Sequence, residues 1–285
     1  MIKNIFCFLV LFVLFTPVVN GQRKKKLNTN NKGTLFGQVG YNRSAYSSTD
    51  IALEGSDYSI QLKEAMVDDN LEGKPMANFF SSSSPQISAK LGFFIANKLA
   101  ITASFDRYNT FFQEKQTVTL DGTFAPGSNS EFSGSYDNES TAINRNQFNI
   151  AQRSGINYFA IGVQRNDQWY KSRKATFEFQ TLCGAQIGGL FTQIDYTYDG
   201  YTTQEISSLS GFGLSLNAGI RLAFIQHIYV QLEVRGGWLN QNQIKLSQSG
   251  SVMGKQVVGF FSPAISIGFN LFALSSNACG TCPQW

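Results

Sequence analysis

Histidine is almost absent from this chain, which has a single one, His227, among 285 residues. Nucleophilic sites of the serine–histidine and cysteine–histidine types need a histidine beside the nucleophile, and catalytic zinc sites usually need more than one. His227 is therefore the single candidate for such chemistry. It lies in the short segment IQHI between two apolar stretches, where a histidine without a catalytic role is the simpler interpretation.

Long hydrophobic runs are missing everywhere except at the N-terminus. Lys3 precedes a mostly apolar stretch from Ile5 to Val19, and small residues follow up to Gly21. This order predicts a secretory signal peptide over residues 1–21. A membrane anchor is the alternative, but the stretch is shorter than the roughly 20 residues that a spanning helix needs. No later segment approaches the length and apolar character of a transmembrane helix.

Cysteine is scarce as well. Cys7 lies inside the predicted signal peptide, which leaves Cys183, Cys279 and Cys282. The motif CGTC offers only two metal ligands and no histidine follows it, so we predict neither a metal site nor a cofactor. An exported protein can form disulfides, and a bridge between Cys279 and Cys282 is permissible. The oxidation state of this pair stays open.

An excess of positive charge is missing from most of the chain. The formal net charge is +4, but Lys3 and the RKKK run at residues 23–26 carry five positive charges. Subtracting these five from +4 leaves −1 for the remainder. We therefore expect no nucleic-acid partner. Residues 22–32 are predicted to be a polar, basic tail in solvent, with contact to anionic lipid head groups as the alternative.

What the chain does contain is strict alternation of apolar and polar residues. In residues 211–224, GFGLSLNAGIRLAF, every even position is apolar and every odd position is small or polar. This period of two predicts a β-strand with one apolar and one polar face. It is longer than the roughly 5–6 residues of most strands. Seven further segments alternate in this way: 34–41, 86–95, 99–108, 157–163, 176–187, 229–238 and 264–274.

The connections between these eight segments alternate in length. Short turns on one side and long polar loops on the other are typical of a bacterial outer-membrane β-barrel. We therefore predict an all-β fold, a closed antiparallel transmembrane barrel over residues 33–274. Its apolar faces meet lipid and its small polar faces fill the lumen. The short connections are 96–98, 166–175 and 225–228, and the long ones are 45–85, 113–155, 192–210 and 240–257.

Eight strands place both termini in the periplasm with the short turns, together with a CxxC tail at residues 275–285. Ten strands are the alternative, because residues 50–55 and 57–65 also alternate; we interpret these two as a hairpin standing above the membrane. The last strand is expected to start after Pro263, because proline cannot donate a ladder hydrogen bond.

Aromatic residues are expected to form a girdle at each membrane boundary. The predicted members are Phe93, Trp169, Tyr170, Phe224, Tyr229 and Phe272 toward the turns, and Tyr41, Tyr108, Trp238 and Phe260 toward the loops.

Positive and negative residues are balanced on the faces that should line the lumen. Buried charges persist only when they are paired and hydrogen-bonded. We therefore predict an ionic plug that fills the barrel, with a gated proton or ion path as the alternative. The six residues are Lys90, Arg221, Arg235, Asp106, Glu178 and Glu233.

Two of the long loops are acidic. Loop 45–85 has seven acidic residues and two lysines, and loop 192–210 combines three acidic residues with Tyr196, Tyr198 and Tyr201. These loops predict either a solvated surface or one that binds an extracellular ligand or a divalent cation. We expect a monomer with a structural or surface-recognition role rather than an enzyme. A lipid-modifying enzyme of the outer membrane and a small pore are the alternatives.

Four segments carry a resemblance to a known family: GYNRSAYSSTDIALEG, GFFIANKLAITASFDRYNTF, SGINYFAIGV and EVRGGWL. They resemble a family of small, uncharacterised outer-membrane barrels of Gram-negative bacteria, and more loosely the eight-stranded OmpA/OmpX-like barrels. The resemblance implies contact with outer-membrane lipids and no particular activity. Family members place one histidine after the aspartate that matches Asp106 and another before the segment like GINY. This chain has Arg107 and AQRS there, so it lacks whatever those histidines do.

Overall fold

The computed structural model describes residues 29–69, 86–174 and 176–272, and every regular element in them is a β-strand. No helix in these residues is long and apolar enough to cross a membrane. The predicted signal peptide, most of the basic tail, and Cys279 and Cys282 with the rest of the CxxC tail lie outside the described residues.

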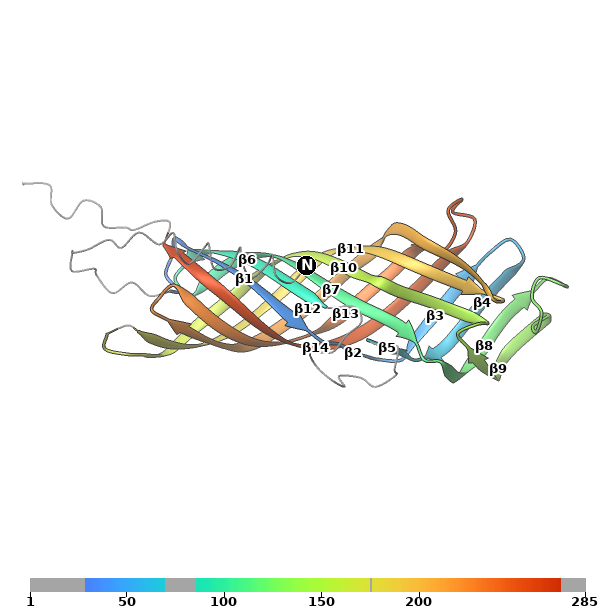
Figure 1. The fold of residues 1–285 in the computed structure, drawn as a ribbon, viewed down its shortest axis with the longest axis horizontal. Helices are drawn as coiled ribbons and strands as arrows, with labels where there is room; N and C mark the ends of the chain where they lie inside the picture. Colours follow the sequence, from blue (N-terminus) through green and yellow to red (C-terminus); the bar gives the residue numbers. More distant parts are fainter. Residues whose placement is uncertain (1–28, 70–85, 175, 273–285) are drawn as a thin grey trace, which may run out of the picture.

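Eight strands form a closed antiparallel ring (Figure 1). Each strand pairs with the next in the ring, and the last pairs back with the first, from Thr34 opposite Phe272 to Asn42 opposite Ala264. The predicted eight-stranded barrel is confirmed. In ring order the strands are β1 (Thr34–Asn42), β6 (Ile87–Ala96), β7 (Leu99–Phe112), β10 (Phe148–Lys171), β11 (Phe177–Tyr198), β12 (Tyr201–Phe224), β13 (Ile228–Lys245) and β14 (Met253–Phe272).

The remaining strands extend one end of the ring. β3 pairs with the upper part of β14, and the sheet continues through β4, β8 and β9 at the end far from the start of β1 (Figure 1). We call these four strands, with the parts of β10–β14 at their level, the head; the rest is the lower barrel. The added strands are β2 (Ala45–Tyr46), β3 (Thr49–Glu54), β4 (Tyr58–Ala65), β5 (Val67–Asp68), β8 (Lys115–Phe124) and β9 (Gly134–Asn144).

The long loop predicted at residues 192–210 is wrong. β11 runs to Tyr198 and β12 starts at Tyr201, so only Asp199 and Gly200 form the turn. Both have positive φ, 49° and 79°, the conformation that an Asp-Gly hairpin turn adopts. Strands also occupy much of the predicted loops 45–85, 113–155 and 240–257. β3 and β4 pair as the hairpin predicted from residues 50–55 and 57–65. The other strands were missed because their outer faces are polar.

Pro263 lies inside β14, so the predicted start of the last strand is also wrong. Its carbonyl accepts a hydrogen bond from the amide of Arg43, which lies between β1 and β2. β14 exchanges partners at this point, from β1 to β2. The side of Pro263 that lacks a donor therefore faces a break in the neighbouring strand, where no ladder bond is lost.

The predicted girdles are correct only where the face of the strand was right. Trp238 is 64% exposed on the outer surface, as expected. Tyr108, Tyr229 and Phe260 are buried instead. Phe260 shares the inner face of β14 with the buried serines of that strand, whereas its neighbour Phe261 is exposed outside. Alternation of faces, rather than height along the strand, decides which aromatic side chains reach the surface.

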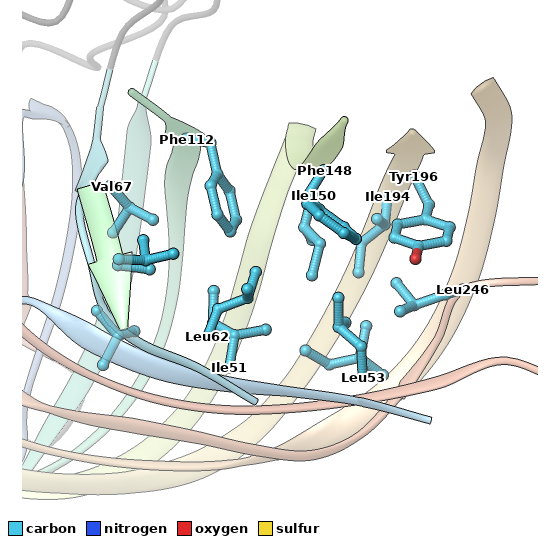
Figure 2. Close-up of a cluster of buried hydrophobic side chains, with 14 of the residues drawn as sticks. Ile51, Leu53, Leu62, Val67, Phe112, Phe148, Ile150, Ile194, Tyr196 and Leu246 are labelled. Atoms are coloured by element: carbon cyan, nitrogen blue, oxygen red, sulfur yellow. The ribbon is translucent and has the colours of Figure 1, made fainter. Parts of the chain in front are cut away.

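The main hydrophobic core lies inside the head. Side chains from β3 and β4 point toward those from β10 and β11 across the interior (Figure 2). Ile51, Leu62, Ile150 and Ile194 are each at most 3% exposed. In the lower barrel the polarity is mostly reversed. Most of its large apolar residues are exposed outside, and its inner face carries buried polar and charged side chains beside one small aromatic cluster.

Candidate functional site

The middle of the lumen holds one ionic network. Glu233 accepts hydrogen bonds from Lys90 Nζ at 3.0 and 3.1 Å, and its Oε1 lies 2.7 Å from Arg235 Nε. Arg235 also pairs with Asp106 through Nη1. All four side chains are at most 1% exposed. Asp106 on β7 and Arg235 on β13 lie four strands apart in either direction around the ring, so this pair crosses the lumen.

Amide side chains complete the network. Gln231 donates to Glu233 at 2.5 Å, and Lys90 donates to Gln164 at 3.3 Å. A buried carboxylate is stabilised only when its lone pairs are satisfied in this way. Four of the six predicted lumen charges are therefore joined in a single cluster.

Arg221 is joined to that cluster through Gln231 and lies among aromatic side chains nearer the turns. Its guanidinium carbon is 3.9 Å from the ring centre of Tyr229 and 4.6 Å from that of Phe36. Its Nε donates to Gln231 at 2.8 Å. Cation–π contacts of this kind strengthen where water is excluded. Phe94, Ala100 and Ala223 are buried with the two rings and fill the lumen at this level.

Glu178 marks the turn-side end of the lumen. It is connected to Lys90 through the amide side chains of Gln180, Asn166 and Gln164. It pairs with Lys171 at 3.0 Å and accepts a hydrogen bond from Thr29 at 2.7 Å. Thr29 and Asn30 belong to the predicted basic tail, yet both are buried, and Asn30 donates to the carbonyl of Asn166 at 3.0 Å. The end of that tail therefore folds against the mouth of the barrel.

A further buried charge pair was not predicted from the sequence. Arg43 binds Asp69 through two hydrogen bonds, at 2.5 and 2.8 Å, and both side chains are fully buried. Asp69 also accepts from the amide of Ser44 and from Gln86. The pair links the gap between β1 and β2 to the segment that follows β5. Neither partner lies in an alternating stretch, so no period marked them; only a contact across 26 residues brings them together.

The far end of the head is closed by residues between β8 and β9. Phe132 is buried and packs on the rings of Phe124 and Phe148, with centres 5.6 and 5.5 Å away. The carbonyl of Ser128 accepts a hydrogen bond from the hydroxyl of Tyr198 at 3.2 Å. This segment therefore spans from β8 to the β11–β12 hairpin.

The tyrosines predicted to form a recognition surface do not lie on one common surface. Tyr201 is 82% exposed, whereas Tyr196 is buried in the head. The Tyr196 hydroxyl lies 2.8 Å from that of Tyr58. Burial raises the pKa of Tyr58 and raises that of Tyr196 well above its usual range. Four exposed acidic residues are on the β3–β4 hairpin: Asp50, Glu54, Asp57 and Glu64. Four more are next to or within β8 and β9: Glu114, Glu131, Asp137 and Glu139.

The other candidates for chemistry lie far from the head. His227 is in the turn between β12 and β13, with Nδ1 3.3 Å from the carbonyl of Asn270 and its ring against Phe272. Cys183 is a free thiol exposed on the outer face of β11. In the described part of the chain, no three His, Cys, Asp or Glu side chains are grouped closely enough to hold a metal ion.

Fold and lumen together define the class. A closed, eight-stranded antiparallel barrel with an apolar outer belt and a lumen filled by side chains has the architecture of small outer-membrane barrels. No protein-family model and no curated protein matches the chain.

Solved structures similar to this chain have low sequence identity to it. The β-barrel domain of OprF from Pseudomonas aeruginosa has 7% identity and a TM-score of 0.35, over 84% of this chain and 98% of that one. Outer membrane protein OprG from the same organism has 11% identity and a TM-score of 0.34, over 86% of this chain and 99% of that one. Ail, the attachment invasion locus protein of Yersinia pestis, has 10% identity and a TM-score of 0.33, over 84% of this chain and 99% of that one.

Proposed function

We propose that this protein is an integral outer-membrane β-barrel that does not conduct and that holds a rigid, folded head outside the cell. One observation carries the proposal, the reversal of polarity along continuous strands. On the outer face of β11, Ile187 and Phe191 are 53% and 42% exposed, and Gln193 and Asp195 follow directly above them. The inner face changes in the opposite sense, from Gln186 to Ile194. A lipid belt below and water above account for both changes.

The proposed lack of conductance rests on the three levels at which side chains fill the interior. The aromatic floor around Arg221, the ionic network around Glu233 and the hydrophobic core of the head follow one another along the barrel. A pore would need a continuous polar path, and the apolar core of the head interrupts it. The acidic outer face of the β3–β4 hairpin is the surface that we propose for contact with an extracellular partner.

Thiol labelling in intact cells tests the location and the orientation. In a variant in which Cys183, Cys279 and Cys282 are replaced by serine, Ser140→Cys on the exposed β9 should react with a membrane-impermeant maleimide. Lys174→Cys, in the turn between β10 and β11, should react only after the outer membrane is permeabilised. The reverse pattern would refute the orientation. Steady single-channel currents from the purified protein in planar bilayers would refute the filled lumen.

A further inference from the structure

Two grooves lie next to each other on the outer wall where the belt meets the head. The lower groove has a volume of about 840 Å³ and is almost entirely apolar. Leu214 and Leu216 on β12, Trp238 on β13 and Phe261 on β14 are exposed along it. Its floor is formed where Gly236 and other glycines leave the wall without side chains.

Gly236 is not required by the packing of the barrel. A Cβ added there would approach only the carbonyl of Phe260, at 3.6 Å, which is ordinary contact. The neighbouring Gly237 is different, because its Cβ would lie 2.0 Å from the carbonyl of Leu214. A side chain at position 236 would therefore project into the lower groove without disturbing the strands.

The upper groove continues along the same strands and is polar. It measures about 590 Å³ and is lined by Asn240 and Asn242 of β13, Lys255 of β14, Asp50 of β3 and Gln61 of β4. Strand register joins the two grooves directly. Trp238 pairs with Gly259 in the lower groove, and the next outward pair, Asn240 with Val257, lines the upper one.

We propose that the two grooves together bind one lipid of the outer leaflet, with an acyl chain in the lower groove and a sugar headgroup in the upper one. The inference rests on the proposed membrane location, because the apolar groove is continuous with the lipid-facing belt. Amide and carboxylate groups from β3, β4 and β13 match the many hydroxyls of a sugar. The lining has a single cation, Lys255, which is 3.3 Å from Glu54, so a headgroup recognised by phosphate alone fits less well. Trp238 is exposed where the apolar groove gives way to the polar one, the position expected for an indole ring at a membrane interface.

Native mass spectrometry of the full-length protein in micelles tests this site. Two probes are used. One is lipid A, which is an acylated glucosamine disaccharide, and the other is phosphatidylethanolamine. One lipid A should remain bound per barrel, and Gly236→Leu and Asn242→Leu should each lower the bound fraction by about tenfold, a loss of ~1.4 kcal/mol. The matched control is Ala103→Leu, on the outer face of β7 across the ring; it should bind lipid A as the unchanged protein does.

Two results would overturn the lipid site: equal retention of lipid A by all three variants, or equal retention of phosphatidylethanolamine by the unchanged protein. Neither result bears on the proposed function, because the location and orientation are tested separately by thiol labelling. A shift in gel mobility between folded and boiled protein checks that each variant is folded before it is compared.

Discussion

The lower barrel and the head are built from the same strands with opposite rules of burial. In the lower barrel, residues such as Ile161 face outward with 66% exposure while Glu233 and Arg235 are buried. In the head, Ile51 and Leu53 are buried while charged residues of the same hairpin face outward. β10 to β14 cross from one region to the other without a break. A strand's period of two therefore fixes only which residues share a face, and the surrounding solvent decides which face is apolar.

The two regions should also differ in what stabilises them. In the head, apolar area is removed from water, which contributes about 25 cal/mol per Å². In the lower barrel, outward apolar residues exchange one apolar neighbour for another, so the backbone ladder and the buried polar contacts have the larger share. Removal of a charge should therefore have its largest effect in the lower barrel.

The largest effect is expected from Glu233→Leu. This change leaves Lys90 without its carboxylate and removes one of the two carboxylates that face Arg235. Loss of one partner of a buried charge pair costs about 3–5 kcal/mol. The free energy of unfolding, measured by urea titration in lipid vesicles, should fall by that amount. Gel mobility should report loss of the folded barrel at lower urea concentration.

The double variant Lys90→Met with Glu233→Leu is the control for this prediction. It removes both ends of the pair, and Arg235 keeps Asp106 as its partner. Replacing a buried ion pair by apolar residues is often neutral, so most of the lost stability should return. A double variant as unstable as Glu233→Leu alone would show that these side chains matter for their shape rather than for their charge.

A pair of arginine substitutions compares the outer surfaces directly. Ile161→Arg places a cation in the middle of the lower belt, where the cost near the bilayer midplane is about 2–4 kcal/mol. Ser207→Arg makes the same kind of change on the exposed outer face of β12 in the head, where surface substitutions usually stay within about 0.5 kcal/mol. Equal stability losses in vesicles would mean that the two outer faces meet the same solvent.

Alternation allowed the sequence to predict the lower barrel well, but of the head it predicted only the β3–β4 hairpin. The period of two in residues 211–224 marked β12, and the same parity identified six charges that the structure buries. The rest of the head was missed because its outward residues are polar and its inward ones are spaced by bulges. One such bulge lies in β12 at Gly211, where the register with β11 shifts. Parity counted through a bulge changes face, so the upper parts of the strands resembled loops.

Particular side-chain pairs between segments distant in sequence were not predictable. Arg43 and Asp69 sit in irregular stretches, and Thr29 reaches Glu178 across 149 positions. Neither pair has a local pattern, because each depends on how the ring closes. The sequence could show that lumen charges must be paired, but it could not identify which residues form each pair.

The smallest effect is expected from Tyr58→Phe, and it should be confined to the head. The change removes the hydroxyl contact with Tyr196, worth about 0.5–1.5 kcal/mol. Because burial raises the pKa of both tyrosines above the unfolded value of about 10, the folded head holds these protons more tightly than the unfolded chain. The stability they contribute is therefore present below pH ~10 and falls as the pH rises above it.

Near-ultraviolet circular dichroism during alkaline titration should show the head loosening, with a shallower decline in Tyr58→Phe. Gel mobility should show that the lower barrel stays folded over the same range, and its simultaneous loss would mean that the two regions unfold as one unit.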